Sequence, residues 1–191
     1  MRKISILGVL FFLLSVLTLP ASGFSGEGGT FYTKLNIWYE KPMKIYSTNY
    51  HKGALITVGT KVKILSKGRA RFGVGKKAIK FREVETGMEA RIVLIKDYTN
   101  LNSEEFFNRY FSSENVLNSS EYVSFSSMEK KNIEEGTIEV GMSKAAVLMA
   151  YGYPPSHKTP SVETDFWTYW RSRLISFSVK FMDGRVIKVL D

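Results

Sequence analysis

The pattern of apolar and polar residues changes along the chain, from alternation in the first half to helical spacing in the second. Between residues 30 and 100, short alternating runs are separated by glycine-containing turns. Short strands at this spacing are typical of a small β-barrel or meander. The strand candidates are segments 31–39, 43–50, 54–58, 62–64, 78–84 and 89–96. The first half is therefore predicted to be a β domain.

Helices are expected after this β region. Residues 103–111 place Phe107, Tyr110 and Phe111 at helical spacing, and we expect this aromatic stripe to pack onto the barrel. Ser103 is the candidate cap of this helix. The segment that follows is rich in serine and asparagine, so residues 101–125 are predicted to form a short helix and a linker between two domains.

Two further helices are predicted from their end signals. Ser126 and Glu129 have the spacing of a capping box, and the helix that they open would end at Gly136. The next helix lies within residues 139–155, where Ser143 can cap the first free amide groups.

The far end of that second helix is equally well marked. Gly152 suits a left-handed stop, and the two prolines that follow prevent continuation. Spacing predicts an apolar face made of Val147, Leu148 and Tyr151.

Strands are expected again at the end of the chain. Asp183-Gly184 between two alternating apolar segments is a strong hairpin signal. In the preceding strand, Trp167 and Tyr169 share one face and should pack onto the second helix. Trp170 takes the opposite face, where it is a candidate interface anchor. Residues 126–191 thus form helix, helix, strand and hairpin, and the chain as a whole is predicted to be α+β.

Four motifs carry a resemblance to a known family. Gly-Met-Ser at 141–143, Tyr-Gly-Tyr-Pro at 151–154, Trp-Thr-Tyr at 167–169 and Phe-Met-Asp-Gly-Arg-Val at 181–186 occur in this order. This arrangement is similar to the BamE (SmpA/OmlA) family, small outer-membrane lipoproteins of the β-barrel assembly machinery. The resemblance implies two helices packed on a three-stranded antiparallel sheet over residues 126–191.

The first half adds a second resemblance and a departure. Segment 53–62 is similar to the turn and strand of bacterial SH3-like domains, so residues 30–100 are expected to form an SH3-like barrel. The lipoproteins' modified cysteine is missing, and Phe24 stands at the corresponding position. A lipid anchor through cysteine is therefore not expected.

The amino terminus predicts export. Residues 1–23 combine Arg2 and Lys3, an apolar run and small residues, which is the pattern of a signal peptide cleaved after Gly23. An uncleaved membrane anchor is the alternative. Cleavage would lower the formal net charge from +9 by two, to +7. We expect a periplasmic or envelope-associated protein.

No catalytic, cofactor or metal site is predicted. The chain has no cysteine, which excludes disulfides and thiol catalysis. His51 and His157 are predicted to be surface residues without metal partners. The carboxylate pairs at 104–105 and 134–135 are adjacent on helices and face different ways, so neither is an acid/base pair.

The candidate binding residues are basic and aromatic. Segment 68–77 is a glycine-containing hairpin tip with four cations, Arg69, Arg71, Lys76 and Lys77. Such a cluster can contact lipid head groups, lipopolysaccharide, acidic glycans or an envelope protein, and a simply solvated tip is the alternative. Nucleic acid is not an expected partner. The second candidate surface is the strand with Trp167, Tyr169 and Trp170.

These features predict a non-catalytic envelope protein that acts by binding a protein or an anionic surface. The resemblance connects it with outer-membrane assembly or envelope maintenance. Two alternatives stay open: a hydrolase acting on cell-wall or polysaccharide material, and an inhibitor-like or structural interaction module.

Overall fold

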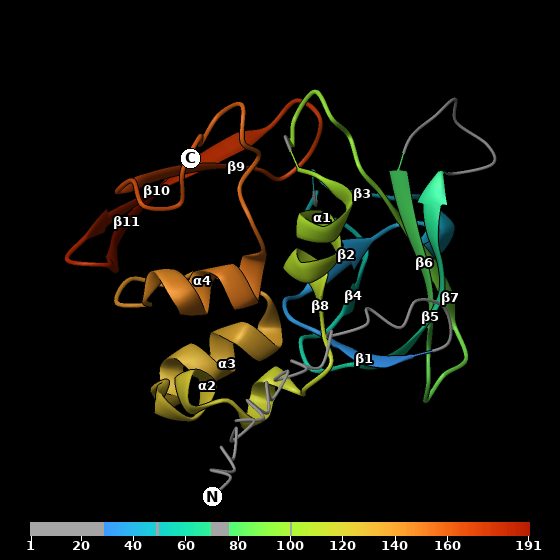
Figure 1. Cartoon of the computed structure of the whole chain (residues 1–191). Coiled ribbons are helices and arrows are strands. Elements are labelled where there is room, and N and C mark those ends of the chain that lie inside the picture. Colours follow the sequence, from blue (N-terminus) through green and yellow to red (C-terminus); the bar gives the residue numbers. More distant parts are fainter. Residues whose placement is uncertain (1–28, 49, 70–76, 100) are drawn as a thin grey trace, which may run out of the picture.

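The computed structural model describes residues 29–48, 50–69, 77–99 and 101–191. The predicted signal peptide and the central residues of the basic hairpin tip, 70–76, lie outside these ranges. The described chain is α+β, with a curled mixed sheet in the first half and helices covering a smaller sheet in the second (Figure 1). Within the described ranges, no helix is long and apolar enough to cross a membrane.

The larger sheet has six strands in the order β3-β7-β6-β5-β1-β8. All pairs are antiparallel except β3 with β7. Its strands are β1 (Thr30–Thr33), β3 (Ile45–Tyr46), β5 (Lys61–Arg69), β6 (Lys77–Glu83), β7 (Glu89–Val93) and β8 (Phe111–Ser112). A separate two-stranded sheet pairs β2 (Ile37–Tyr39) with β4 (Ala54–Ile56).

The predicted strands at 31–39 and 43–50 are interrupted, and the one at 62–64 is part of the longer β5. Segment 31–39 is divided into β1 and β2, which belong to different sheets. The strand is interrupted at Asn36, whose backbone N–H donates to the Met149 carbonyl in the second half rather than to a neighbouring strand. Segment 43–50 contains only the short β3, because a 3-10 turn at Pro42–Lys44 precedes it. Pro42 lacks an N–H and favours a turn over a sheet interior.

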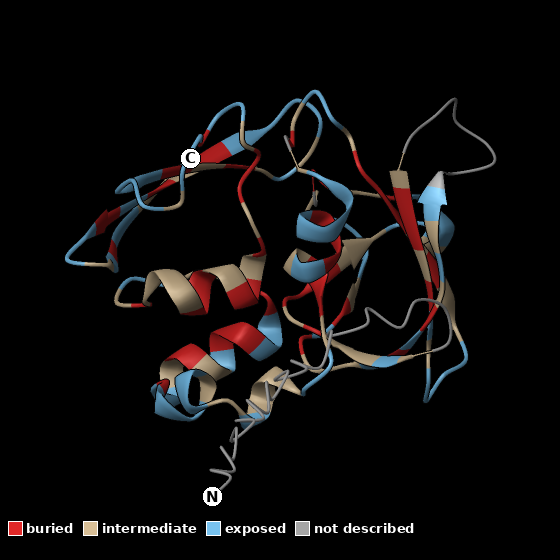
Figure 2. Cartoon of the chain, viewed as in Figure 1, coloured by how far each residue is buried: buried red, intermediate tan, exposed pale blue. Residues whose placement is uncertain are grey.

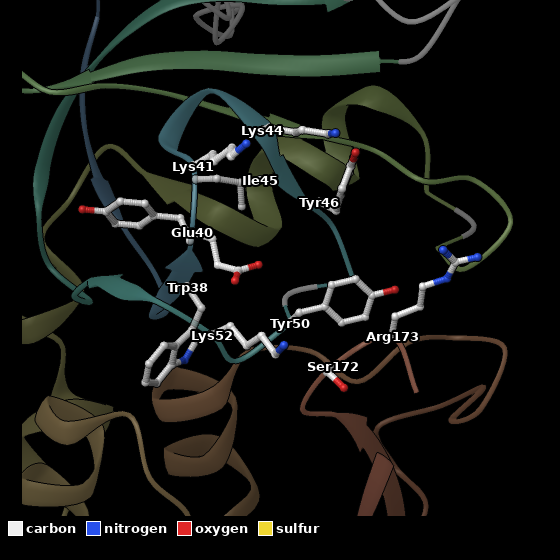
Figure 3. A pocket seen from close by; sticks show the side chains of 11 residues that line it. Trp38, Glu40, Lys41, Lys44, Ile45, Tyr46, Tyr50, Lys52, Ser172 and Arg173 are labelled. Atoms are coloured by element: carbon white, nitrogen blue, oxygen red, sulfur yellow. The ribbon is translucent and has the colours of Figure 1, made fainter. Parts of the chain in front are cut away.

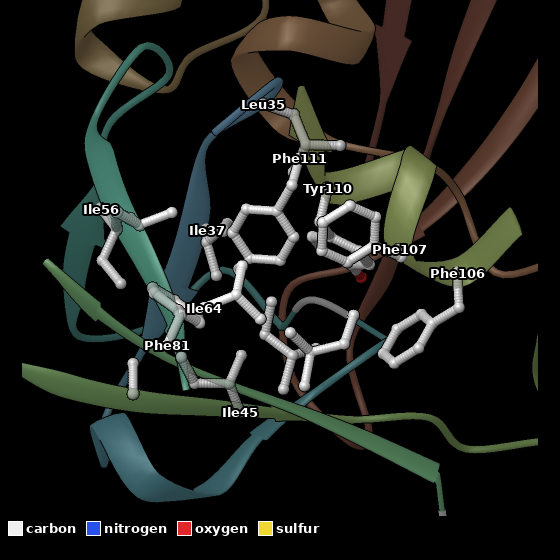
Figure 4. Packing of buried hydrophobic residues seen from close by; sticks show 14 of the residues in the cluster. Leu35, Ile37, Ile45, Ile56, Ile64, Phe81, Phe106, Phe107, Tyr110 and Phe111 are labelled. Atoms are coloured by element: carbon white, nitrogen blue, oxygen red, sulfur yellow. The ribbon is translucent and has the colours of Figure 1, made fainter. Parts of the chain in front are cut away.

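The first core lies between the curled sheet and helix α1 (Ser103–Tyr110) (Figure 4). The predicted aromatic stripe is confirmed, and Phe106 joins it; all four aromatic side chains pack with Ile37, Ile64 and Phe81. Asn102, rather than Ser103, caps the helix, and Glu105 completes the capping box.

The second half contains the 3-10 turn η2 (Val116–Asn118), α2 (Ser120–Ser124), α3 (Ser127–Glu135) and α4 (Lys144–Tyr151). They lie beside an antiparallel sheet in the order β11-β10-β9, whose strands are β9 (Phe166–Trp170), β10 (Ser176–Met182) and β11 (Arg185–Leu190).

Most predicted end signals of this half are confirmed, but Gly152 ends α4 with a φ of 80° and a ψ of −173°, outside the left-handed helical region. Ser126 and Glu129 form the capping box of α3, and Ser143 caps α4. Asp183 and Gly184 both have positive φ, 49° and 74°, as a two-residue hairpin turn between β10 and β11 requires.

The second core lies between α4 and the three-stranded sheet (Figure 2). Trp167 and Tyr169 are fully buried there, as the strand alternation predicted. The buried face of α4 differs from the prediction: Ala146, Val147, Met149 and Ala150 are buried, whereas Leu148 and Tyr151 are only partly covered. The helix is covered on more than one side, because α3 and the Asn36 segment also lie against it.

One side chain joins the two halves of the molecule. The buried Asn36 amide nitrogen donates to the carbonyl oxygens of Ile133 in α3 and Ala150 in α4, at 2.6 and 3.0 Å. Its amide oxygen accepts from the Val58 N–H at 2.8 Å. Asn36 thus bonds a carbonyl near the carboxyl end of each of two helices, and also one backbone N–H in a loop of the first half.

Candidate binding cleft

A cleft of about 410 Å³ lies where the segment 38–52 of the first half meets the β9–β10 loop of the second (Figure 3). Its lining combines aromatic rings with charged side chains. The lining residues are Trp38, Tyr39, Glu40, Lys41, Lys44, Ile45, Tyr46, Tyr50, Lys52, Ser172 and Arg173.

One wall of the cleft is formed by the end of β2 and the turn that follows it. Trp38 and Tyr39 lie at the end of β2, and the turn that begins at Pro42 carries Lys44 across to β3. The Arg91 side chain of β7 donates to the Met43 carbonyl at 3.0 Å and fixes this turn on the sheet. Gly53 precedes β4 and has a φ of 84°. It lies against the end of β2, where a Cβ would collide with the Tyr39 carbonyl.

The charge of the lining is strongly unbalanced. Lys41, Lys44, Lys52 and Arg173 face a single lining carboxylate, that of Glu40. Over the part of the chain that the structure describes, none of these four cations lies within 4.0 Å of a carboxylate oxygen. The four cations therefore give the cleft a positive potential, which no ion pair within the described ranges neutralises.

Tyr50, a lining residue of the cleft, belongs to a cluster of aromatic rings from both halves. Tyr50 stacks on Trp170 with ring centroids 5.7 Å apart and an interplanar angle of 7°. Tyr98 and His157 contact the same indole edge-on, at 5.3 and 5.2 Å. Burial raises the pKa of Tyr50, so its phenol stays neutral at physiological pH. Trp170 is thus half-buried in a ring cluster, not an exposed anchor on a flat sheet.

His51 follows Tyr50 in the chain and contacts both α4 and β9. Its Nε2 is 2.8 Å from the Tyr151 carbonyl oxygen, and its Nδ1 is 3.3 Å from that of Trp170. Its ring also stacks on Tyr151. Burial lowers the pKa of His51 to about 4, although the two carbonyl contacts oppose this shift. The prediction of surface histidines is correct for the exposed His157 but wrong for His51, which is half-buried with both ring nitrogens near carbonyl oxygens of the second half.

The predicted site residues are only partly brought together. Arg69 ends β5 and Lys77 begins β6, whereas Arg71 and Lys76 lie outside the described residues. The strand registers place Arg69, Lys77 and the cleft residue Tyr46 at the same end of the large sheet. Trp167 and Tyr169 are core residues, and their side chains are not available to a partner.

Reasoning from the sequence did not find the cleft itself. A signal exists in segment 38–52, where the aromatic residues Trp38, Tyr39, Tyr46 and Tyr50 are interleaved with three lysines. Arg173 could not be added from the sequence, because only the fold brings the β9–β10 loop to this segment.

In the described ranges, no group of three histidine, cysteine, aspartate or glutamate side chains is placed to hold a metal ion. The lining cations and phenols can bind the oxygens of a phosphate or carboxylate, while the rings can pack against its apolar part. Comparison of the chain with models of protein families, with curated proteins and with solved structures finds no match.

Proposed function

We propose that this chain is a non-catalytic binding protein whose cleft recognises an anionic ligand. The observation that carries this proposal is the set of four lining cations, Lys41, Lys44, Lys52 and Arg173, without a carboxylate partner among the described residues. Like charges held side by side repel one another, and an anionic ligand would relieve that repulsion.

The proposal includes the setting that the sequence predicts. An exported protein in the envelope meets lipid head groups, lipopolysaccharide and acidic glycans, all of which carry phosphate or carboxylate. We also propose that the first half is an SH3-like barrel and that residues 126–191 form a BamE-like unit. Such an arrangement would suit a role in outer-membrane assembly or envelope maintenance, with the cleft between the two units as the binding surface.

The composition of the cleft favours binding over hydrolysis of polysaccharide. Most glycosidases use a pair of carboxyl groups, roughly 5 to 10 Å apart, on either side of the scissile bond. Glu40 is the one carboxylate in the cleft lining, where it lies among lysines. Nearby cations favour the ionised form of a carboxyl group, so they disfavour the protonated acid that such a pair needs. The same cations would stabilise a bound anion.

A charge-matched pair of variants tests the proposal. Lys41→Glu/Lys44→Glu/Lys52→Glu reverses the cleft charge, whereas Lys61→Glu/Lys63→Glu/Lys188→Glu makes the same net change at exposed lysines outside the cleft lining. Calorimetric titration would use two soluble probes, an oligogalacturonide and a short polyphosphate. We expect the cleft variant to bind roughly tenfold more weakly or worse, because each ion contact contributes up to about 1 kcal/mol. Equal affinities for the two variants would contradict the proposal.

A further inference from the structure

The loop between β9 and β10, residues Arg171–Ile175, carries an unusually exposed aliphatic tip. The Leu174 side chain is 92% exposed, and that of Ile175 is 57% exposed. The backbone N–H groups of Arg171 and Ser172 both donate to the Ile175 carbonyl, at 2.9 and 3.2 Å. The chain thus closes a small loop that holds these two apolar side chains outward instead of folding them onto the sheet.

Two arginines, Arg171 and Arg173, belong to the same loop as this tip. Arg173 precedes Leu174 and lines the cleft, on the side opposite Lys41 and Lys44 (Figure 3). Lys52 adds a further exposed cation to the same cleft. Arg171, at the base of the loop, pairs with Asp191 at 2.6 Å and lies over the Phe177 ring, so it fixes the loop to the sheet.

We infer that this tip docks the protein on a lipid bilayer with anionic head groups. Leu174 and Ile175 enter the apolar boundary of the bilayer, while Arg173 and the cleft lysines contact lipid phosphates. Aliphatic side chains flanked by long cationic ones suit this interface, because the cations stay at the level of the head groups. The inference rests on the proposed function and specifies it, since it names lipid phosphate as the source of the anion.

The shape of the tip favours a bilayer over a protein partner. A stable protein interface buries about 800 Å² on each side around packed anchor residues. Two aliphatic side chains on a projecting loop offer little of that area. A bilayer accepts such a projection without a complementary pocket, and neighbouring cations add to its attraction by about fivefold in affinity each.

Vesicle sedimentation tests the inference with the mature chain that begins at Phe24, so that the apolar run of the predicted signal peptide cannot contribute. The vesicles are phosphatidylcholine alone, or phosphatidylcholine and phosphatidylserine at three parts to one. We expect binding to the mixed vesicles only. Leu174→Ser/Ile175→Ser should weaken this binding roughly tenfold, because the apolar insertion is lost.

The control removes a different exposed apolar pair. Met182→Ser/Ile187→Ser alters the other end of the three-stranded sheet, where these side chains are 59% and 37% exposed. This variant should bind the mixed vesicles as the unaltered chain does. If it loses binding while the Leu174 variant keeps it, the docking surface is the sheet face and the inference is wrong.

A single label gives a direct readout of insertion. Because the chain has no cysteine, Leu174→Cys can be labelled uniquely with an environment-sensitive dye. Its emission should shift to the blue with mixed vesicles, whereas the same dye at Met182→Cys should not respond. An unchanged spectrum at position 174 would overturn the inference.

The two proposals can fail separately. If Leu174→Ser/Ile175→Ser binds both the vesicles and the soluble oligogalacturonide as the unaltered chain does, the lipid inference is wrong while the anion-binding cleft stands. If the unaltered chain binds the oligogalacturonide but no vesicles, the ligand is an acidic glycan and not a bilayer. If Lys41→Glu/Lys44→Glu/Lys52→Glu retains full binding to every probe, both proposals are wrong.

Discussion

Glu129 is the carboxylate on which the packing of the second half depends most clearly. Its side chain is 4% exposed at the start of α3. One oxygen accepts from the backbone N–H and the hydroxyl of Ser126, at 3.0 and 2.9 Å. The other accepts from the Ser143 N–H at 2.9 Å, and Arg185 lies 3.8 Å from it. Glu129 thus joins the amino ends of α3 and α4, two sites that favour negative charge.

The size of this contribution follows from the shift in its pKa. Burial alone would raise the pKa of Glu129, but the hydrogen bonds from Ser143 and Ser126 lower it from 4.5 to about 2. A shift of this size corresponds to about 3 kcal/mol of stability when the group is ionised. Since the folded-state pKa is depressed, this stability is present above about pH 5 and is lost as the pH falls toward 2.

We therefore expect Glu129→Gln to lower the free energy of unfolding by about 2 to 4 kcal/mol at pH 7. Its amide would place an NH₂ donor against the N–H of Ser126 or Ser143, which leaves buried donors facing each other. Urea denaturation followed by circular dichroism at pH 7 and at pH 2.5 measures the effect. The gap between variant and unaltered chain should shrink at the lower pH.

Glu134→Gln is the matched control, because it changes an exposed glutamate on the same helix and should alter stability by less than about 0.5 kcal/mol. The reasoning would be refuted if Glu129→Gln were as stable as this control at pH 7. A gap that stayed constant down to pH 2.5 would refute the electrostatic part alone.

Two further predictions concern the junction between the halves. Asn36→Ala should destabilise the protein by about 3 kcal/mol or more, since it leaves the Val58 N–H and two helix carbonyls buried without the side chain that bonds them. Denaturant midpoints would be compared with those of Asn115→Ala, which changes an asparagine in a partly exposed turn. Similar midpoints for the two variants would contradict this role of Asn36. Burial lowers the pKa of His51 from 6.5 to about 4, so the unfolded chain binds an extra proton between these values and stability should decline by about 3 kcal/mol as the pH falls through this window. Stability measured across that window should lose this dependence in His51→Phe and largely keep it in His157→Phe, whereas an unchanged slope in His51→Phe would show that another group titrates.

Much of the local structure could be predicted from the sequence, because its determinants are neighbours along the chain. Ser126 with Glu129, Ser143, and the Asp183-Gly184 turn each act over a few residues, and the structure has the caps and the turn at these positions. The burial of Trp167 and Tyr169 follows in the same way from strand alternation. The α+β class follows from the order of these signals.

The candidate site could not be predicted in this way, because its parts are distant in sequence. The cleft combines residues of segment 38–52 with Arg173, and its lining residue Tyr50 stacks on Trp170. The sequence instead indicated the hairpin tip at 68–77, since charge density within ten residues is visible without a fold.

The sequence by itself thus determined where helices begin and end, which strand faces are apolar and how the final hairpin turns. Tertiary structure alone decided that Asn36 would interrupt a strand to bond two helices, that His51 would contact the Tyr151 carbonyl, and that lysines from one half would face an arginine from the other. The physical reason is the distance over which each kind of interaction acts. Capping and alternation depend on backbone geometry within one or two turns, whereas burial and electrostatic potential depend on every group that folding brings within a few ångströms.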